Sequence, residues 1–283
     1  MALYDPEAVR QFYNSYGERE WNRFEGPFGQ VKAHVTRCFL ERHLGADLRV
    51  LDAGSGPGRF AIALARRGCA VTLVDVSEAM LEEAERRLVA EGLGGQVEGV
   101  HRCSYLDLGF VESGRFDAVV CIGGSLNYMP ERVPEALAEL GRVLRPGGVL
   151  VGGVMCAMGS LRDVLVGGWK PADDGLDGPA LLRVVRTGVL EVDGRPISEH
   201  RARMFSLAEV QGFLAGGGLT LVEASATDCL LRLPEAQLEE LRRDAAWEAL
   251  LEAEVEACRR APEVGGHLLF AARQAGRDGR ALR

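Results

Sequence analysis

The stretch that decides the fold is Val50-Leu51-Asp52-Ala53-Gly54-Ser55-Gly56-Pro57-Gly58. Its apolar beginning predicts a buried strand, and its glycines allow the backbone to turn sharply into a helix while lying close to a ligand. Amides at the beginning of that helix favour an anionic group. Asp75 follows Gly54 by 21 residues, after a second predicted strand, where a carboxylate can accept hydrogen bonds from both hydroxyls of a ribose. The segment from Val50 to Asp75 therefore predicts a nucleoside-cofactor site.

Strands and helices alternate from this stretch toward the C-terminus. Apolar runs are followed by helical patterns, and glycines separate one from the next. This alternation predicts an α/β fold with a doubly wound, mostly parallel sheet, whose ligand binds beyond the carboxyl ends of the strands. The predicted strands are 49–53, 70–74, 97–102, 116–122 and 149–155, and the predicted helices are 60–67, 77–90 and 134–144.

Segments with other patterns flank this alternation on both sides. Before it, Asp5 and Pro6 begin a helix that ends near Gly17, and a second helix is predicted at about 30–44. After it, an Asp-Gly pair predicts a β-hairpin that caps the site, because this dipeptide favours tight turns between strands. The elements predicted there are hairpin strands at 181–192 and 195–205, a helix at 206–215, a strand at 219–224, a helix at about 234–260 and a short strand at 267–272.

Composition disfavours several classes of protein. The 283 residues carry a formal net charge of −8 without a long run of like charges, whereas a protein that binds nucleic acid usually presents a basic face. No apolar stretch approaches the ~18 residues of a membrane span, and residues 1–10 lack the apolar region of a signal peptide. The seven cysteines contain no CxxC pair, which indicates reduced thiols. We therefore expect a cytoplasmic protein without nucleic-acid or membrane partners.

A dinucleotide site is the first rival for the glycine stretch. Sites for NAD and FAD use the pattern Gly-x-Gly-x-x-Gly, which would require a third glycine at position 59. That position is Arg59, and the glycines here follow the pattern Gly-x-Gly-x-Gly instead. A nicotinamide-dependent oxidoreductase is therefore disfavoured.

With these segments in order, the chain resembles the class I S-adenosylmethionine-dependent methyltransferases, strongly over about residues 45–154. The resemblance implies S-adenosylmethionine as cofactor, S-adenosylhomocysteine as product, and a seven-stranded sheet whose last strand is antiparallel. Five segments carry it: 50–58 looks like the first motif, 71–77 is similar to the second, 103–108 occupies the adenine-binding segment, 116–120 is similar to the fourth strand, and 144–148 resembles the turn before the fifth.

The resemblance also implies which residues contact the cofactor. The glycine backbone flanks its methionyl part, Asp52 orients that part, and Asp75 holds the ribose hydroxyls. Ser104 departs from the pattern, because many relatives have an acidic residue there that accepts a hydrogen bond from the adenine amino group, and Asp107 is an alternative acceptor. Val76 and Met80 pack against adenine. The complete predicted set of cofactor-binding residues is Asp52, Gly54, Gly56, Gly58, Asp75, Val76, Met80, Ser104, Tyr105, Cys121, Tyr16 and Arg23.

Three residues are candidates for substrate contact or catalysis. Asn127 and Tyr128 follow the fourth predicted strand, in a run that lacks the Asn/Asp-Pro-Pro-aromatic signature of the family's adenine- and glutamine-modifying members. His200 lies on the predicted hairpin and could be a general base near neutral pH or an ordinary surface histidine. A sulfonium is already a strong electrophile, so methyl transfer depends mainly on alignment, and some acceptors need no base. The other histidines show no metal-ligand spacing, and no metal is expected.

Two segments are predicted to enclose the site. Residues 1–45 form an N-terminal helical lid that includes Tyr13, Tyr16 and Arg23, although its aromatic side chains could instead be core anchors. Residues 46–283 form the methyltransferase domain, with a substrate cap inserted at about 157–205. The enclosure and the acidic charge favour a small-molecule acceptor.

Two alternatives stay open. A non-catalytic nucleoside-binding regulatory module would bind the cofactor without room beside the methyl group. A methyltransferase of a soft substrate, an arsenical or a thiol, would use Cys103, Cys121 and Cys156 near the ends of three strands, although a free cysteine is often simply a small buried residue. The sequence names neither the acceptor atom nor the substrate, and it leaves the choice between monomer and homodimer open.

Overall fold

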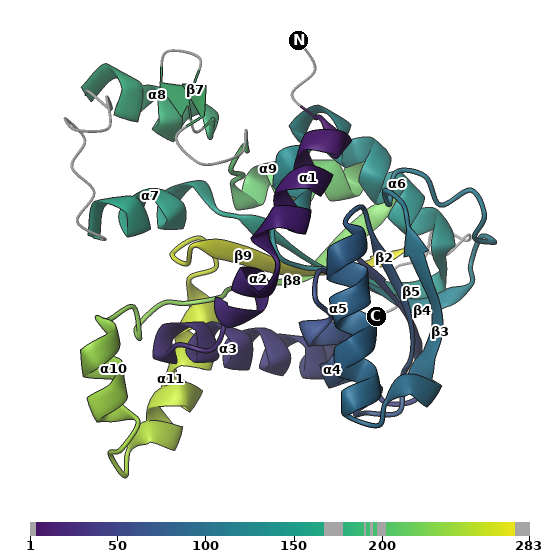
Figure 1. The fold of residues 1–283 in the computed structure, drawn as a ribbon. Helices are drawn as coiled ribbons and strands as arrows, with labels where there is room; N and C mark the ends of the chain where they lie inside the picture. The colour runs from purple at the N-terminus through teal and green to yellow at the C-terminus, as the bar shows by residue number, and fades with distance from the viewer. Residues whose placement is uncertain (1–3, 167–177, 190, 193–194, 197–201, 275–283) are drawn as a thin grey trace.

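The computed structural model describes residues 4–166, 178–189, 191–192, 195–196 and 202–274. Its main sheet has seven strands in the order β3-β2-β1-β4-β5-β9-β8 (Figure 1). The first five strands in this order, β3, β2, β1, β4 and β5, pair in parallel with their neighbours. Strand β9 lies between β5 and β8 and is antiparallel to both. The predicted fold class and its antiparallel last strand are confirmed. The strands are β1 (Arg49–Ala53), β2 (Ala70–Asp75), β3 (Val97–Arg102), β4 (Phe116–Cys121), β5 (Leu144–Met155), β8 (Leu219–Ala226) and β9 (His267–Gln274).

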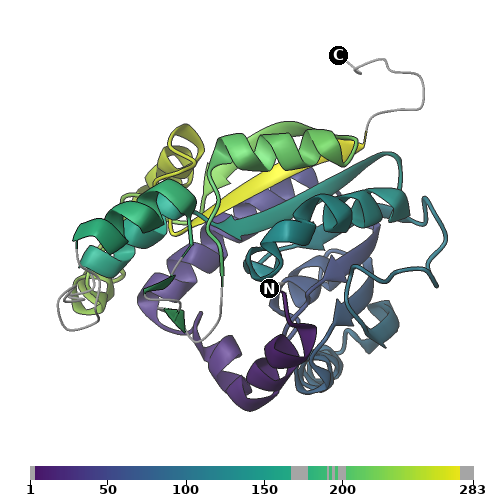
Figure 2. The same ribbon diagram turned by 90° about the horizontal axis from the view of Figure 1, so that it is seen from above.

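Helices cover both faces of the sheet, as the view from above shows (Figure 2). On one face, Leu64 of α4 packs with Val71 and Val120, because alternate strand residues point to the same side. On the other face, Leu140 of α6 shares a buried cluster with Phe270. The helices on the first face are α3 (Pro27–His43), α4 (Arg59–Ala65) and α5 (Glu78–Ala90), and those on the second are α6 (Val133–Val143) and α9 (Leu207–Gly216).

The N-terminal helices begin and end close to where the sequence predicts. The side chain of Asp5 accepts hydrogen bonds from two backbone amides of α1 (Pro6–Tyr16), and proline occupies the first turn. Gly17, at a φ of +55°, separates α1 from α2 (Glu18–Asn22). Helix α1 contacts α5, so the N-terminal segment lies across the sheet edge where the parallel strands end.

The predicted β-hairpin is wrong over much of its first strand. Residues 178–187 form the helix α8 (Gly178–Thr187), which follows α7 (Ala157–Val166). Apolar residues at 181, 182, 184 and 185 fit one side of a helix, and Val184 is fully buried. Pairing is confined to β6 (Glu191–Val192) with β7 (Arg195–Pro196) and to a bridge between Val189 and Arg203. The Asp-Gly turn at 193–194 lies outside the described residues.

The C-terminal helix predicted at about 234–260 is two helices. They are α10 (Glu235–Leu241) and α11 (Trp247–Arg260). The carboxylate of Asp244 accepts a hydrogen bond from the amide of Ala246 between them, which stabilises a turn in place of a continuous helix.

Two expectations from composition can be compared with the structure. All seven cysteines are free. Within the described ranges, no helix combines the length and the apolar character that crossing a membrane requires.

Candidate functional site

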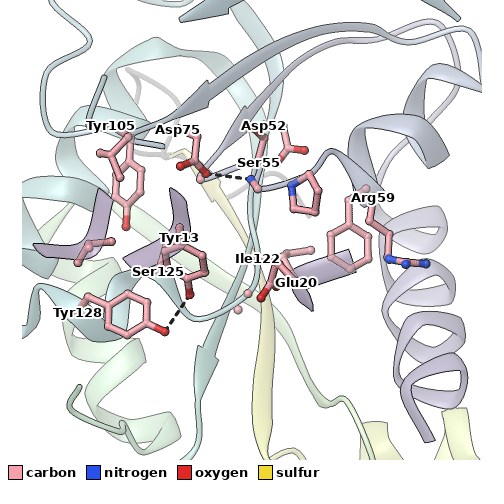
Figure 3. A pocket seen from close by; sticks show the side chains of 18 of the residues that line it. Tyr13, Glu20, Asp52, Ser55, Arg59, Asp75, Tyr105, Ile122, Ser125 and Tyr128 are labelled. Atoms are coloured by element: carbon pink, nitrogen blue, oxygen red, sulfur yellow. Dashed lines mark hydrogen bonds between the residues drawn. The ribbon is translucent and has the colours of Figure 1, made fainter. Parts of the chain in front are cut away.

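A pocket lies at the sheet edge where the parallel strands end (Figure 3). It contains about 1250 Å³ of empty space, part of which is open to solvent. Residues of β1, β2 and the segments after β3 and β4 line it, together with residues of α1, α2, α3 and the beginning of β9.

Asp75 connects the end of β2 to the glycine loop. Its Oδ2 accepts a hydrogen bond of 2.9 Å from the amide of Gly56, and its Oδ1 accepts one of 2.9 Å from the amide of Ser77. Burial raises the pKa of this carboxyl, and the backbone hydrogen bonds oppose that rise. Each oxygen keeps a second lone pair, so the carboxylate can still accept two hydroxyls of a ligand.

Asp52 lies beside Asp75 at the end of β1 and is almost fully buried. Its Oδ2 accepts no hydrogen bond from the described part of the chain. Burial, and next the neighbouring carboxylate of Asp75, raise the pKa of Asp52 to about 7. A buried carboxylate oxygen without a donor is costly, so this position favours a ligand that brings a cation or a donor.

The three glycines of the loop have different surroundings. All have positive φ, at +75°, +51° and +81° for Gly54, Gly56 and Gly58. A Cβ at Gly56 would meet nothing within 4 Å, whereas a Cβ at Gly58 would lie 2.8 Å from the Cβ of Ala84. Gly56 therefore leaves space for a ligand, and Gly58 allows α4 and α5 to approach each other.

This difference predicts unequal effects of two alanine substitutions. We expect Gly58→Ala to lower the free energy of unfolding by about 3 kcal/mol, because a left-handed residue with a Cβ costs ~1–2 kcal/mol and overpacking adds a similar amount. Gly56→Ala should cost about 1 kcal/mol, from the backbone alone. Urea denaturation of both variants measures the difference. Equal losses would contradict the packing role of Gly58.

The segment after β3, for which the sequence predicts a contact with adenine, lines the pocket. Ser104 and Tyr105 line the pocket, and so does Val76 after β2. The hydroxyl of Ser104 accepts a hydrogen bond from the amide of Leu106 and lies 3.3 Å from the hydroxyl of Tyr4. The alternative acceptor Asp107 is exposed and does not line the pocket.

Polar side chains line the other half of the pocket. The hydroxyls of Tyr13 and Tyr128 share a hydrogen bond of 3.0 Å, and burial raises the pKa of both phenols (Figure 3). Glu20 and Arg23 form an ion pair of 2.7 Å on α2. Burial raises the pKa of Glu20 despite this partner. This half therefore combines hydroxyl groups with an ion pair.

His267 and Lys32 lie in the same half. The Nζ of Lys32 is 3.5 Å from the Nδ1 of His267, and both residues line the pocket. Burial, followed by the positive charges of Lys32 and Arg23, lowers the pKa of His267 well below its usual range. His267 is the first residue of β9 and pairs with Met155, the last residue of β5. It therefore lies at the same sheet edge as the glycine loop.

Trp21 joins α2 to the helices beside the glycine loop. The guanidinium of Arg59, on α4, lies 3.8 Å from its ring centre, and that of Arg87, on α5, lies 3.7 Å from it. Arg59 also donates to the backbone oxygen of Trp21, at 2.8 Å. These contacts hold α2, with its ion pair, over the pocket.

Several predicted site residues do not line the pocket. The amide of Asn127 donates to the carbonyls of Met155 and Arg203, and its Oδ1 accepts from the amide of Met155. These hydrogen bonds occupy both the amide nitrogen and the oxygen of the side chain. Asn127 therefore connects its own segment with the backbones of Met155 and Arg203 instead of contacting a substrate. His200 lies outside the described residues. Gly58, Met80, Cys121 and Tyr16 are also absent from the lining, whereas Asp52, Gly54, Gly56, Asp75, Val76, Ser104, Tyr105, Arg23 and Tyr128 belong to it.

Part of the polar lining has no counterpart among the residues that the sequence predicts for the site. Glu20, Lys32 and His267 belong to three elements that no short motif connects. One signal was available, because Lys32 is one of only two lysines in a chain whose other cations are arginine. His267 begins a predicted strand, but the sequence around it shows neither metal-ligand spacing nor a motif that indicates a ligand.

Residues 50–148 match the family model described as "Methyltransferase domain". The chain is 28% identical over 150 residues to the chloroplastic magnesium protoporphyrin IX methyltransferase of Arabidopsis thaliana, which covers 48% of this chain and 47% of that protein. It is 33% identical over 126 residues to the tRNA 5-carboxymethoxyuridine methyltransferase of Escherichia coli (strain K12), covering 43% and 47%. The chain spans about half the length of the curated relatives it matches.

A solved structure extends the likeness of the fold to most of the chain. The 1,6-didemethyltoxoflavin-N1-methyltransferase of Burkholderia thailandensis, crystallised with 1,6-didemethyltoxoflavin and S-adenosylhomocysteine, superposes with a TM-score of 0.59. The match covers 95% of this chain and 88% of that one at 19% sequence identity. At this sequence identity, the likeness supports the architecture alone. The methyl acceptor of this protein has to be inferred from its own residues.

Proposed function

We propose that the protein is a class I S-adenosylmethionine-dependent methyltransferase, as the methyltransferase-domain match of residues 50–148 supports, and that it transfers a methyl group from S-adenosylmethionine to a small-molecule acceptor. The product is then S-adenosylhomocysteine. The observation that carries the proposal is the unpartnered Oδ2 of Asp52, buried beside Asp75 and the open backbone of Gly56. Together these groups match a ligand with an ammonium at one end and ribose hydroxyls at the other.

The residues present fit this cofactor. Asp52 would accept the ammonium of its methionyl part, and Asp75 would accept the ribose hydroxyls while it fixes the loop through Gly56. Tyr105 and Val76 would pack near the base. The cofactor supplies an electrophilic methyl group, and the chain aligns an acceptor with it and excludes water, which can provide up to roughly 7–11 kcal/mol of barrier reduction.

The polar half of the pocket supports a small acceptor. It is enclosed by α1 and α2 and continuous with the cofactor half, so a molecule in it would lie close to the cofactor. One relative acts on magnesium protoporphyrin IX by its name, and another is named for tRNA. The net charge of −8 favours the small acceptor, because nucleic acid requires a basic surface.

The alternative function, methylation of a soft substrate bound by cysteine thiols, has less support than methylation of another small molecule. Burial raises the pKa of Cys103 to about 11 and that of Cys121 to about 12, so both stay protonated, whereas a soft metal binds thiolate. Across the described ranges, no three side chains of His, Cys, Asp or Glu are grouped to hold a metal ion.

Calorimetry and a turnover assay test the proposal. We expect S-adenosylhomocysteine to bind with micromolar affinity or tighter, and NADH not to bind. Isotope-labelled S-adenosylmethionine, incubated with a metabolite extract, should label a small molecule but not RNA. Binding of NADH alone would overturn the proposal, cofactor binding without any labelled product would favour the non-catalytic module, and labelled RNA would overturn the small acceptor.

The raised pKa of Asp52 predicts proton release when the cofactor binds. An ammonium at this site favours the ionised carboxylate, so binding should release about half a proton at pH 7 and close to one at pH 6, given a pKa of about 7. Affinity should therefore rise with pH up to about 7. Calorimetry in buffers of different ionisation enthalpy measures the release. Asp52→Asn should abolish it, and an unchanged release in that variant would refute the assignment.

Several features of the proposal concern the whole chain. Residues 1–45 act as a lid, which is supported by the lining residues on α1 and α2. The substrate cap predicted at about 157–205 has no such support, because none of its described residues lines the pocket. The location is cytoplasmic, in keeping with seven free cysteines. Monomer and homodimer stay open.

A further inference from the structure

His267 lies in the polar half of the pocket. The site runs along one sheet edge from Asp75 at the end of β2 to His267 at the beginning of β9. Neighbouring strands lie ~4.8 Å apart, so four strand spacings place these residues roughly 19 Å from each other. His267 therefore stands at the end of the pocket away from the ribose site, where an acceptor would bind.

The contact with Lys32 decides which ring nitrogen of His267 carries the proton. An ammonium has three donors and no acceptor, so the Nδ1 that faces it, at 3.5 Å, must be the accepting nitrogen. The proton of the neutral ring then lies on Nε2. His267 is a lining residue of the pocket, and in this tautomer its Nε2 is a hydrogen-bond donor, whereas a general base would need an accepting nitrogen there.

The charged groups around the ring favour its neutral form. Lys32 comes from α3 and Arg23 directly follows α2, and their positive charges oppose protonation. The carboxylates on this side are engaged: Glu20 pairs with Arg23 at 2.7 Å, and Asp228 lies 3.9 Å from Lys32 and also accepts from Arg162. An oxygen bound at Nε2 therefore meets a donor and nearby cations.

We propose that His267 and Lys32 bind the acceptor through an oxygen anion, so that the substrate is an acidic hydroxyl compound: a phenol, an enol or a carboxylic acid. This inference rests on the proposed methyl transfer. A lone pair of the anion forms the C–O bond to the methyl carbon while the C–S bond breaks, and its electron pair stays on sulfur. The proton has left the acceptor before this step, and neither residue removes it.

The test uses 4-nitrophenol, whose absorbance reports its ionisation, with the protein saturated by S-adenosylhomocysteine. We expect the bound probe to ionise at least one pH unit below the free probe, which corresponds to tenfold tighter binding of the anion. Lys32→Met and His267→Leu should each remove most of this shift. 4-Nitroaniline, an uncharged probe of the same shape, should bind wild type and variants within threefold.

Two further variants make the test specific. Arg37→Met removes an exposed cation from the same helix and should leave the shift unchanged. His267→Gln keeps a donor near the position of Nε2, so the bound probe should still ionise at lower pH, and the affinity for its anion should stay within threefold of wild type. A general base could not be replaced by an amide. An unshifted probe, no binding of 4-nitrophenol, or a shift that survives both Lys32→Met and His267→Leu would overturn the inference. Failure of S-adenosylhomocysteine to bind would overturn the proposed function instead.

Discussion

Asp75→Ala is expected to weaken binding of S-adenosylhomocysteine about 100-fold. The carboxylate would accept two ribose hydroxyls, and a hydrogen bond to a charged group contributes ~1.5–3 kcal/mol, so losing both costs about 3 kcal/mol. The substitution also removes the acceptor for the amides of Gly56 and Ser77, which loosens the loop. Calorimetry measures the affinity, and circular dichroism checks the fold.

Two companion variants sharpen this result. Asp75→Asn keeps one acceptor oxygen and the side-chain size, and we expect a loss of about tenfold. Asp107→Ala removes an exposed acid next to the adenine segment and should leave affinity unchanged, since its side chain does not line the pocket. Affinity within threefold of wild type in Asp75→Ala would mean that the ribose site lies elsewhere.

Glu254→Leu is expected to lower the free energy of unfolding by about 4 kcal/mol. Its fully buried carboxylate accepts hydrogen bonds of 2.6, 2.7 and 3.0 Å from the amides of Cys229, Leu230 and Leu231. Each buried donor left without a partner costs ~1–3 kcal/mol, and some of the three would find water. The loss is a large part of a typical total of 5–15 kcal/mol.

Urea denaturation measures this loss against a matched control. Glu252→Leu makes the same change at an exposed position of α11 and should alter stability by no more than about 0.5 kcal/mol. Glu254→Gln, which keeps one acceptor oxygen, should fall between the two. A Glu254→Leu protein as stable as the Glu252→Leu control would show that water replaces the carboxylate without cost.

The convergence of the glycine loop and Asp75 on one pocket could be predicted, because these residues are close in sequence and in space. Gly54, Gly56 and Asp75 come from β1, β2 and the loop between them, and parallel pairing brings those strand ends together. The residues of the polar half are not close to one another in sequence. Glu20 and His267 are more than 200 residues apart, and only the antiparallel insertion of β9 beside β5 brings His267 to this edge.

Two local misreadings have physical reasons as well. Asn127 looked like a free polar residue of a loop, but the backbone groups that occupy its amide belong to Met155 and Arg203, which only the fold brings near. Helix α8 looked like a strand because a dense apolar run fits both periods. For Asn127, contacts remote in sequence therefore determine the outcome.

The stacked Trp21 gives the pocket an optical reporter. Helix α2 carries Trp21 between two guanidiniums, and its end carries the Glu20–Arg23 pair that lines the pocket. Any movement of α2 that admits a ligand must alter both stacks, and with them the emission of the indole. The chain has three tryptophans, so replacing Trp169 and Trp247 with phenylalanine would leave a single emitter. Entry and exit of ligands could then be followed in real time without a label.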